Sequence, residues 1–338
     1  MAGRRNDKAI MISNADSIKK SQEFSMAKLN HGLTLNQMQL LAYAIYATQR
    51  DGSTTFIKAD FEKKFEMEKY QTIHAQEDAQ KLVSIQFSTE DLGNDKFRYW
   101  NVFQEIEYDK GTFNFKWTDR MLPHILDLKD KYVRTDLRVT SKFNSSYSWI
   151  LYDYLKANYG YWYKTLSKDE LLNLFGVENT KTYINYTGKF KQSVLDKAIS
   201  EINEYTEINV KYEDVKEGRT IAGFKLIWST GKVKHKASKK QMDILQSIAD
   251  VVFEDAFMYM GIKDDIKRER ALKIIRNLQE TKSNYLDTDV GLTSDKCSEL
   301  TKKASNDLEA LNYLLEEEGK ETLKPRVPMH DWLAEYRN

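Results

Sequence analysis

The pattern of helices and strands in this chain occurs twice in the same order, and this repetition is the feature that most restricts its fold. Each copy has a helical segment, a short helical segment, a longer amphipathic helix and two strand segments joined by a tight turn. The segments are 33–48, 58–67, 74–87 and 96–118 in the first copy, and 146–159, 167–177, 188–205 and 208–228 in the second. One such order arises by chance in many α+β domains, but two copies make that explanation weak. We therefore predict an α+β fold with two tandem winged-helix domains related by an internal pseudo-repeat.

Local signals mark the ends of several segments. Ser167, followed three positions later by Glu170, forms a capping-box sequence at the start of the second short helix. Asp60 is a candidate cap for the first short helix. The hairpins are expected to turn at 109–111 and near 217–218, where glycine supplies the left-handed backbone that tight turns need.

The segment 179–195 contains no carboxylate, and it leads into the amphipathic helix predicted at 188–205. In a helix-turn-helix pair the second helix presents its first turns to the major groove. The apolar positions, which must then face the core, are Phe190, Val194, Ala198 and Ile202. The opposite arc consists of Lys189, Gln192, Ser193, Asp196 and Ser200. Lys and Gln side chains bond purine edges, and an acid-free helix start avoids repelling phosphate, so we predict a DNA-binding face.

Basic residues near this helix also favour DNA binding. Lys216 and Arg219 fall on the predicted wing, and the segment 231–240 carries five lysines without an acid, Lys232 and Lys234 among them. Such a segment can follow a phosphate backbone. It is equally typical of a solvated linker, as lysines at a helix start are typical of a solvated surface, and both alternatives stay open.

The rest of the composition argues against other classes of protein. Formal net charge is +1, so contact with nucleic acid has to come from local patches. Cys297 is the single cysteine, the five histidines are scattered, and no phosphate-binding glycine loop occurs. We therefore expect no metal, no cofactor and no catalytic residue, and read the chain as a binding protein rather than an enzyme. No long apolar run and no signal-peptide pattern occur, which favours a cytoplasmic protein without membrane contact.

Three motifs together resemble the iteron-binding replication initiators of theta-replicating plasmids, whose members have two winged helices. They are SSYSWILYDYL (145–155), DELLNLFGV (169–177) and FKQSVLDKAISEINEYTEINVKY (190–212). The resemblance covers roughly residues 25–230. It implies a double-stranded DNA ligand, namely direct repeats at a replication origin and the protein's own promoter. It further implies a homodimer in equilibrium with a monomer, opening of the origin, and recruitment of the host initiator and replicative helicase.

The resemblance also implies roles for individual residues. Nearest the bases it puts Lys189, Lys191, Gln192 and Ser193. Nearest the phosphates it puts Lys181, Tyr183, Lys216 and Arg219. Lys191 falls beside the apolar face of its helix, so we expect it to reach DNA from the flank or not at all.

These observations give a division of the chain into four parts. Residues 1–24 are expected to be a flexible segment, 25–135 a first winged helix for dimerisation and auxiliary DNA contact, and 136–232 a second that binds origin repeats. Residues 233–338 are expected to form a basic linker and a helical C-terminal extension with helices at 242–261, 264–280 and 293–319. The last residues, around Trp332, either pack on their own domain or dock on a partner.

Two further functions compete with the initiator. A double-winged-helix transcriptional regulator would bind DNA but would not support replication. A protein-interaction scaffold would lack even non-specific affinity for DNA. A replication assay and a gel shift at low salt separate the three.

Overall fold

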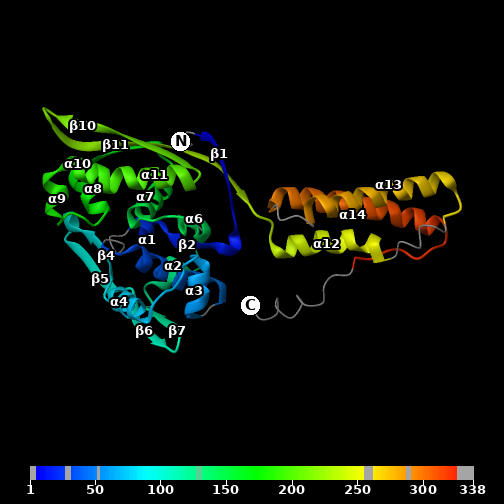
Figure 1. Cartoon of the computed structure of the whole chain (residues 1–338), viewed down its shortest axis with the longest axis horizontal. Helices are drawn as coiled ribbons and strands as arrows, with labels where there is room; N and C mark the ends of the chain where they lie inside the picture. Colours follow the sequence, from blue (N-terminus) through cyan, green and yellow to red (C-terminus); the bar gives the residue numbers. More distant parts are fainter. Residues whose placement is uncertain are drawn as a thin grey trace. The chain divides into compact units, whose positions relative to one another are not determined.

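The computed structural model describes residues 5–26, 32–51, 54–126, 128, 131–254, 262–286 and 291–325 (Figure 1). The chain divides into two compact units. One comprises Met1–Ile12 and Asp16–Val233, and the other Ser13–Ala15 and Lys234–Asn338. Among the helices in these described ranges, none combines the length and the apolar character needed to cross a bilayer.

The first winged helix follows the predicted order with one added hairpin. Its elements are α2 (Leu35–Asp51), β3 (Thr55–Ile57), α3 (Lys58–Lys64), α4 (Thr72–Val83), β4 (Gln86–Asp91), β5 (Lys96–Asn101), β6 (Phe103–Asp109) and β7 (Thr112–Trp117). Strands β3, β7 and β6 form an antiparallel sheet in that order. The turn between β6 and β7 has positive φ at Lys110 and Gly111, as the glycine led us to expect.

Two details of this domain differ from the prediction. The helix expected at 74–87 ends at Val83, because Phe87 belongs to β4, which pairs with β5. The Phe87 ring lies 4.9 Å from the Trp100 ring on β5, in a tilted arrangement. Asp60 does not cap α3, because strand β3 runs directly into the helix and leaves Ile57 at the capping position without a side-chain bond.

The second winged helix repeats the same arrangement. Its elements are α7 (Ser146–Ala157), β9 (Tyr163–Ser167), α8 (Lys168–Leu174), α9 (Lys181–Asn185), α10 (Thr187–Phe190), a π-helical turn η4 (Lys191–Leu195), α11 (Asp196–Tyr205), β10 (Ile208–Glu217) and β11 (Thr220–His235). β9 pairs with β11 as β3 pairs with β7, so the pseudo-repeat extends to the sheet topology. The Ser167–Glu170 capping box is present with both of its bonds. The predicted fold of two winged helices is confirmed.

The N-terminal residues are ordered in strands, so the prediction of a flexible segment over 1–24 is wrong for its described part. β1 (Arg5–Ile12) joins the edge of β11, and β2 (Ser17–Ser21) pairs with β8 (Tyr132–Asp136). The short elements around them are η1 (Asn14–Asp16), α1 (Gln22–Met26), α5 (Leu122–Ile125) and α6 (Leu137–Thr140). The partners of β1 and β2 lie more than a hundred residues away, where no local pattern can indicate them.

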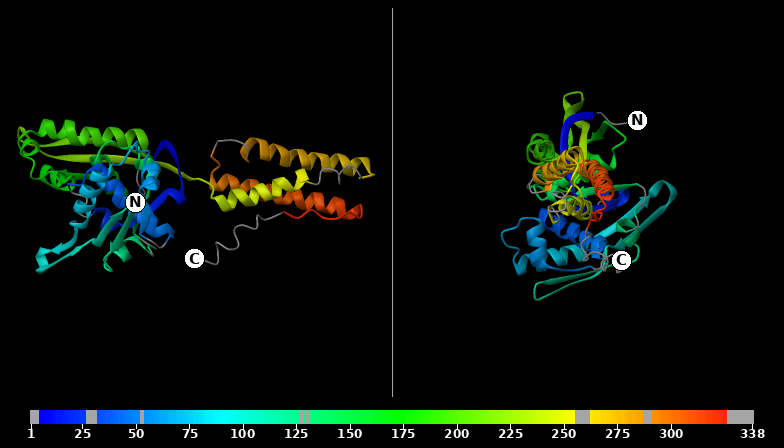
Figure 2. Two further views of the ribbon diagram at one scale, coloured as in Figure 1. Left: turned by 60° about the horizontal axis from the view of Figure 1, so that its bottom comes forward. Right: turned by 90° about the vertical axis from the view of Figure 1, so that its right-hand side faces the viewer.

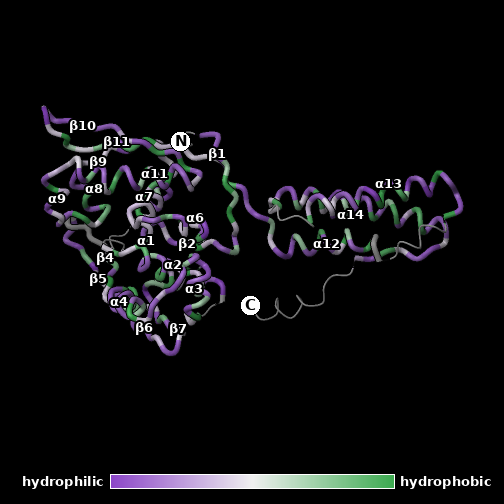
Figure 3. Tube along the Cα trace, viewed as in Figure 1, coloured by the Kyte–Doolittle hydropathy of each residue, from purple (hydrophilic) through white to green (hydrophobic). Residues whose placement is uncertain are grey.

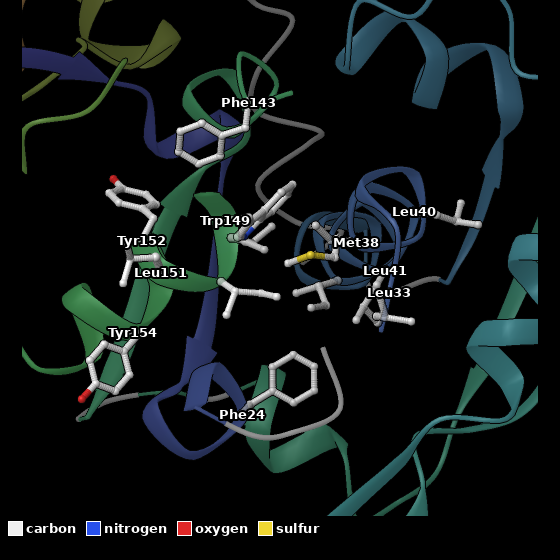
Figure 4. Close-up of a cluster of buried hydrophobic side chains, with 14 of the residues drawn as sticks. Phe24, Leu33, Met38, Leu40, Leu41, Phe143, Trp149, Leu151, Tyr152 and Tyr154 are labelled. Atoms are coloured by element: carbon white, nitrogen blue, oxygen red, sulfur yellow. The ribbon is translucent and has the colours of Figure 1, made fainter. Parts of the chain in front are cut away.

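The two winged helices share one hydrophobic core. Figure 4 shows Trp149 of α7 pointing toward Met38 of α2, with Phe24 nearby. A buried ion pair between Lys20 of β2 and Asp153 of α7 adds a polar contact to this junction. Because charges this deep need a partner, the pair fixes β2 against α7.

The C-terminal unit has its own core of aliphatic side chains. It contains α12 (Lys239–Glu254), α13 (Asp265–Thr281), the π turn η6 (Lys282–Leu286) and α14 (Ser294–Glu317). Figure 2 shows the three long helices side by side, and Figure 3 shows hydrophobic and hydrophilic residues alternating along them. The helical extension is confirmed, whereas the end of the helix expected at 242–261 and the last residues around Trp332 lie outside the described residues. The segment expected as a basic linker is mostly regular, because β11 continues to His235.

Candidate nucleic-acid interface

The candidate interface is built on one helical run, α10, η4 and α11, which spans residues 187–205. Its inner face is completely buried, and the residues there are Phe190, Val194, Leu195, Ala198 and Ile202. The Phe190 ring lies 6.1 Å from the rings of both Phe175 and Phe224, which clamp it between α8 and β11. This packing fixes the rotation of the helix, so the opposite face must point outward.

The outward face carries the predicted residues. Lys189, Gln192 and Ser193 are all exposed, and none is covered by another segment of the described chain. The four apolar positions predicted to face the core are indeed buried, whereas Leu195 was not among them. It is buried because the π-helical turn η4 places one additional residue against the core.

Lys191 is held within the protein. Its Nζ lies 3.0 Å from both carboxylate oxygens of Asp214 on β10 and 5.2 Å from the ring centre of Tyr212. The Tyr212 hydroxyl donates a hydrogen bond of 2.7 Å to Asp196. Burial, and then this bond, raises the pKa of Tyr212, so the phenol remains a donor at neutral pH. These contacts tie the middle of the helical run to the wing and leave Lys191 only partly exposed.

The segment between α9 and α10 is held by hydrogen bonds from Lys168 on α8. The Lys168 Nζ donates to the carbonyl of Ile184 at 2.5 Å and to the Thr187 hydroxyl oxygen at 3.0 Å. Tyr183 is half-buried, and its ring lies 6.2 Å from the Phe190 ring, so this side chain packs against the hydrophobic core. Lys181, at the start of α9, is exposed.

The wing is the hairpin of β10 and β11, and its turn lies between Glu217 and Thr220. Gly218 has a positive φ of 62°, as the tight turn requires, and Lys216 and Arg219 on either side of it are exposed. In Figure 1, α9, α10 and this turn lie at the same end of the domain. The structure therefore brings Lys181, Lys189, Lys216 and Arg219 to one end, together with Gln192 and Ser193.

Lys232 and Lys234 lie apart from these side chains, on β11. Both are exposed on the last part of β11, which starts at Thr220 beside the turn. A strand rises about 3.4 Å per residue, so Lys232 lies roughly 40 Å along the strand from the turn. These two lysines are not part of the group around the helical run 187–205, the candidate recognition helix.

Sequence reasoning missed two residues in this region. Ile184 and Tyr186 are exposed large side chains at the corner between α9 and α10. Tyr186 stands at the capping position of the helical run, which was predicted to begin only at residue 188. The acid-free segment was the signal that could have drawn attention to them. Within the described residues, no group of acidic, His or Cys side chains is arranged to hold a metal ion.

Two family models match the two winged helices, and the comparisons with curated proteins and solved structures stand beside them. A family model described as "Initiator Replication protein, WH1" matches residues 17–156, and one described as "Initiator Rep protein, WH2" matches residues 167–228, together more than half of the chain. No curated protein gives a match. A solved structure of the Pi initiator protein in complex with iteron DNA is 21% identical, with a TM-score of 0.49, and covers 65% of this chain and 99% of that one. RctB domains 2–3 are 10% identical, with a TM-score of 0.36, and cover 67% of this chain and 94% of that one.

Proposed function

We propose that this chain, which belongs to the initiator replication protein family, binds repeated duplex sites at a replication origin through the second winged helix. One observation carries the proposal. The buried inner face of the helical run holds Lys189, Gln192 and Ser193 outward, at the end of the domain where the wing turn also lies. A helix start with these side chains, without acids and with a partial positive charge of its own, suits the edges of bases in a major groove.

The surrounding cations supply the contacts to the phosphate backbone. Lys181 lies before the helix, and Lys216 and Arg219 lie on the wing, all of them exposed. Each phosphate that such a side chain neutralises releases a counterion, so affinity falls as salt rises. Lys232 and Lys234 would meet the phosphate backbone only outside this group, because they lie toward the end of β11. Lys191 would contribute from the flank, since Asp214 holds its ammonium group.

The finer parts of this function follow the family resemblance. We infer that a first winged helix over 25–135 dimerises and helps to contact DNA, and that 136–232 binds the repeats. Residues 233–338 then form the basic and helical extension. Origin opening, repression of the protein's own promoter, and recruitment of the host initiator and helicase belong to the same proposal.

Footprinting on the DNA around the gene tests the proposal. We expect protection of tandem direct repeats, with about two helical turns covered per monomer. The double variant K189A/Q192A should lose the preference for repeats over random duplex, because it lacks the two side chains best placed to read bases. K302A removes the same charge from an exposed position on α14 and serves as the matched control. Unprotected repeats, or a double variant that keeps its preference, would refute the assignment.

A transcriptional regulator with two winged helices is the second candidate. It would give the same footprint but would leave a reporter plasmid unable to replicate. A protein scaffold would shift no random duplex even at low salt.

A further inference from the structure

Two exposed apolar side chains stand at the start of the recognition helix. Ile184 is 43% exposed and Tyr186 is 65% exposed, in a segment that is otherwise polar or basic. Neither makes a ring contact or a side-chain hydrogen bond within the described part of the chain. Burying apolar surface is favourable, so side chains placed in this way gain free energy when a ligand covers them.

The backbone that carries them is rigid. The carbonyl of Tyr186 accepts hydrogen bonds from the amides of Lys189 at 3.0 Å and Phe190 at 3.2 Å, which begins the helix at this residue. The Ile184 carbonyl is held by Lys168 at 2.5 Å. The backbone is therefore already ordered, and binding there does not have to fix a loose loop.

The described chain leaves space free next to the segment between α9 and α10. A Cβ atom added at Gly188, two residues beyond Tyr186, would meet no atom within 4 Å. The nearest charges on the segment are Lys181 and Lys189, and there is no acid between residues 179 and 195. Charge complementarity thus favours an anionic partner, such as the phosphate backbone of a duplex, over a basic or neutral protein surface.

In the major groove, the apolar group that a base presents is the C5-methyl of thymine. We propose that Ile184 and Tyr186 contact thymine methyl groups, and that they give the binding site a preference for thymine at those positions. This inference rests on the proposed function, because it requires the recognition helix to enter a major groove. It adds a means of reading sequence that the polar residues Lys189 and Gln192 do not provide.

The test replaces single thymines of the protected repeat by uracil, which removes only the methyl group. At one or two positions the wild-type protein should lose about fourfold in affinity, as one buried methyl group predicts. Y186A and I184A should bind the thymine site more weakly and should each lose the penalty at one position. I266A removes an exposed apolar side chain from α13 and should keep every wild-type penalty.

The outcomes separate the two ideas. Repeats that are protected but insensitive to uracil at every position would overturn the methyl contact and leave the initiator assignment intact. A uracil penalty that persists in both Y186A and I184A would also overturn it. If no repeat is protected, the proposed function and this inference fail together. Circular dichroism of each variant checks that the exposed substitutions leave the fold unchanged.

Discussion

The Nζ of Lys191 lies 3.0 Å from both carboxylate oxygens of Asp214, so an ion pair joins the recognition helix to the second winged helix's wing. Both side chains are partly exposed, which limits the value of the pair to less than about 1 kcal/mol of folding free energy. Its main consequence is electrostatic. Asp214 places a negative charge near the proposed DNA surface and occupies a lysine that could otherwise meet phosphate.

Replacing Asp214 by asparagine should therefore strengthen DNA binding. D214N removes one negative charge and releases Lys191, so we expect higher affinity and about one additional counterion in the salt dependence. Titrations of duplex DNA over a range of salt concentrations measure both. E269Q removes an exposed acid from α13 without releasing Lys191 and should leave the salt slope unchanged. Equal slopes for D214N and E269Q would contradict the prediction.

Lys8 should stabilise the C-terminal end of the recognition helix. Its Nζ donates to the carbonyls of Asn203, Thr206 and Ile208, where α11 ends and β10 begins. Burial lowers the pKa of Lys8, but the carbonyls still need a donor. K8M leaves them without one and should cost about 1 to 3 kcal/mol of unfolding free energy, measured in urea. K211M, at an exposed position on β10, is the matched control and should stay within about 0.5 kcal/mol of wild type.

The capping box of α8 should make a pH-dependent contribution to stability. Hydrogen bonds from the backbone and side chain of Ser167 lower the pKa of Glu170 below its ordinary value of 4.5. The contribution is therefore complete above that value and is lost as pH falls through the lowered pKa. S167A should cost about 1 kcal/mol at neutral pH. Thermal melts should show the gap between wild type and S167A narrowing below pH 4.5, and a gap that widens there would be inconsistent with this account.

The buried pair of Lys20 and Asp153 should be sensitive to the loss of one partner. D153L and K20M each leave an uncompensated buried charge and should lower the unfolding free energy by about 3 to 5 kcal/mol. The double variant K20M/D153L removes both charges and should recover much of this loss. Urea unfolding of the three variants gives the coupling, and additive losses would show that the two charges act independently.

The helices and hairpin turns of the two winged helices could be predicted from the sequence, because local periodicity and glycine positions determine them. The spacing of Phe190, Val194, Ala198 and Ile202 identifies the buried face of the recognition helix, and Lys189 and Gln192 follow as its outer face. Gly111 and Gly218 mark the two hairpin turns because only a few residues tolerate positive φ.

The features that were missed depend on contacts between distant segments. The pairing of Lys191 with Asp214 needs the register of β10 against the helix, and β1 needs a partner strand more than two hundred residues away. The turn η4 changes the helical phase at residue 195, which a fixed period of 3.6 cannot express. Gln86 and Phe87, the first two residues of β4, were included in the helix predicted at 74–87, and the pairing of β4 with β5 was not predicted.

The strand β1 also affects how the protein can be divided in the laboratory. The Asn6 side-chain amide donates to the carbonyls of Glu207 and Ser229, and a Cβ added at Gly231 would lie 2.3 Å from the carbonyl oxygen of Lys8. The two strands are therefore in direct backbone contact, and the second winged helix includes residues from the beginning of the chain. A fragment limited to residues 136–232 would lack β1 and would leave the edge of β11 unpaired and open to self-association. An affinity tag fused before β1 would be attached next to the second winged helix, because β1 pairs with β11.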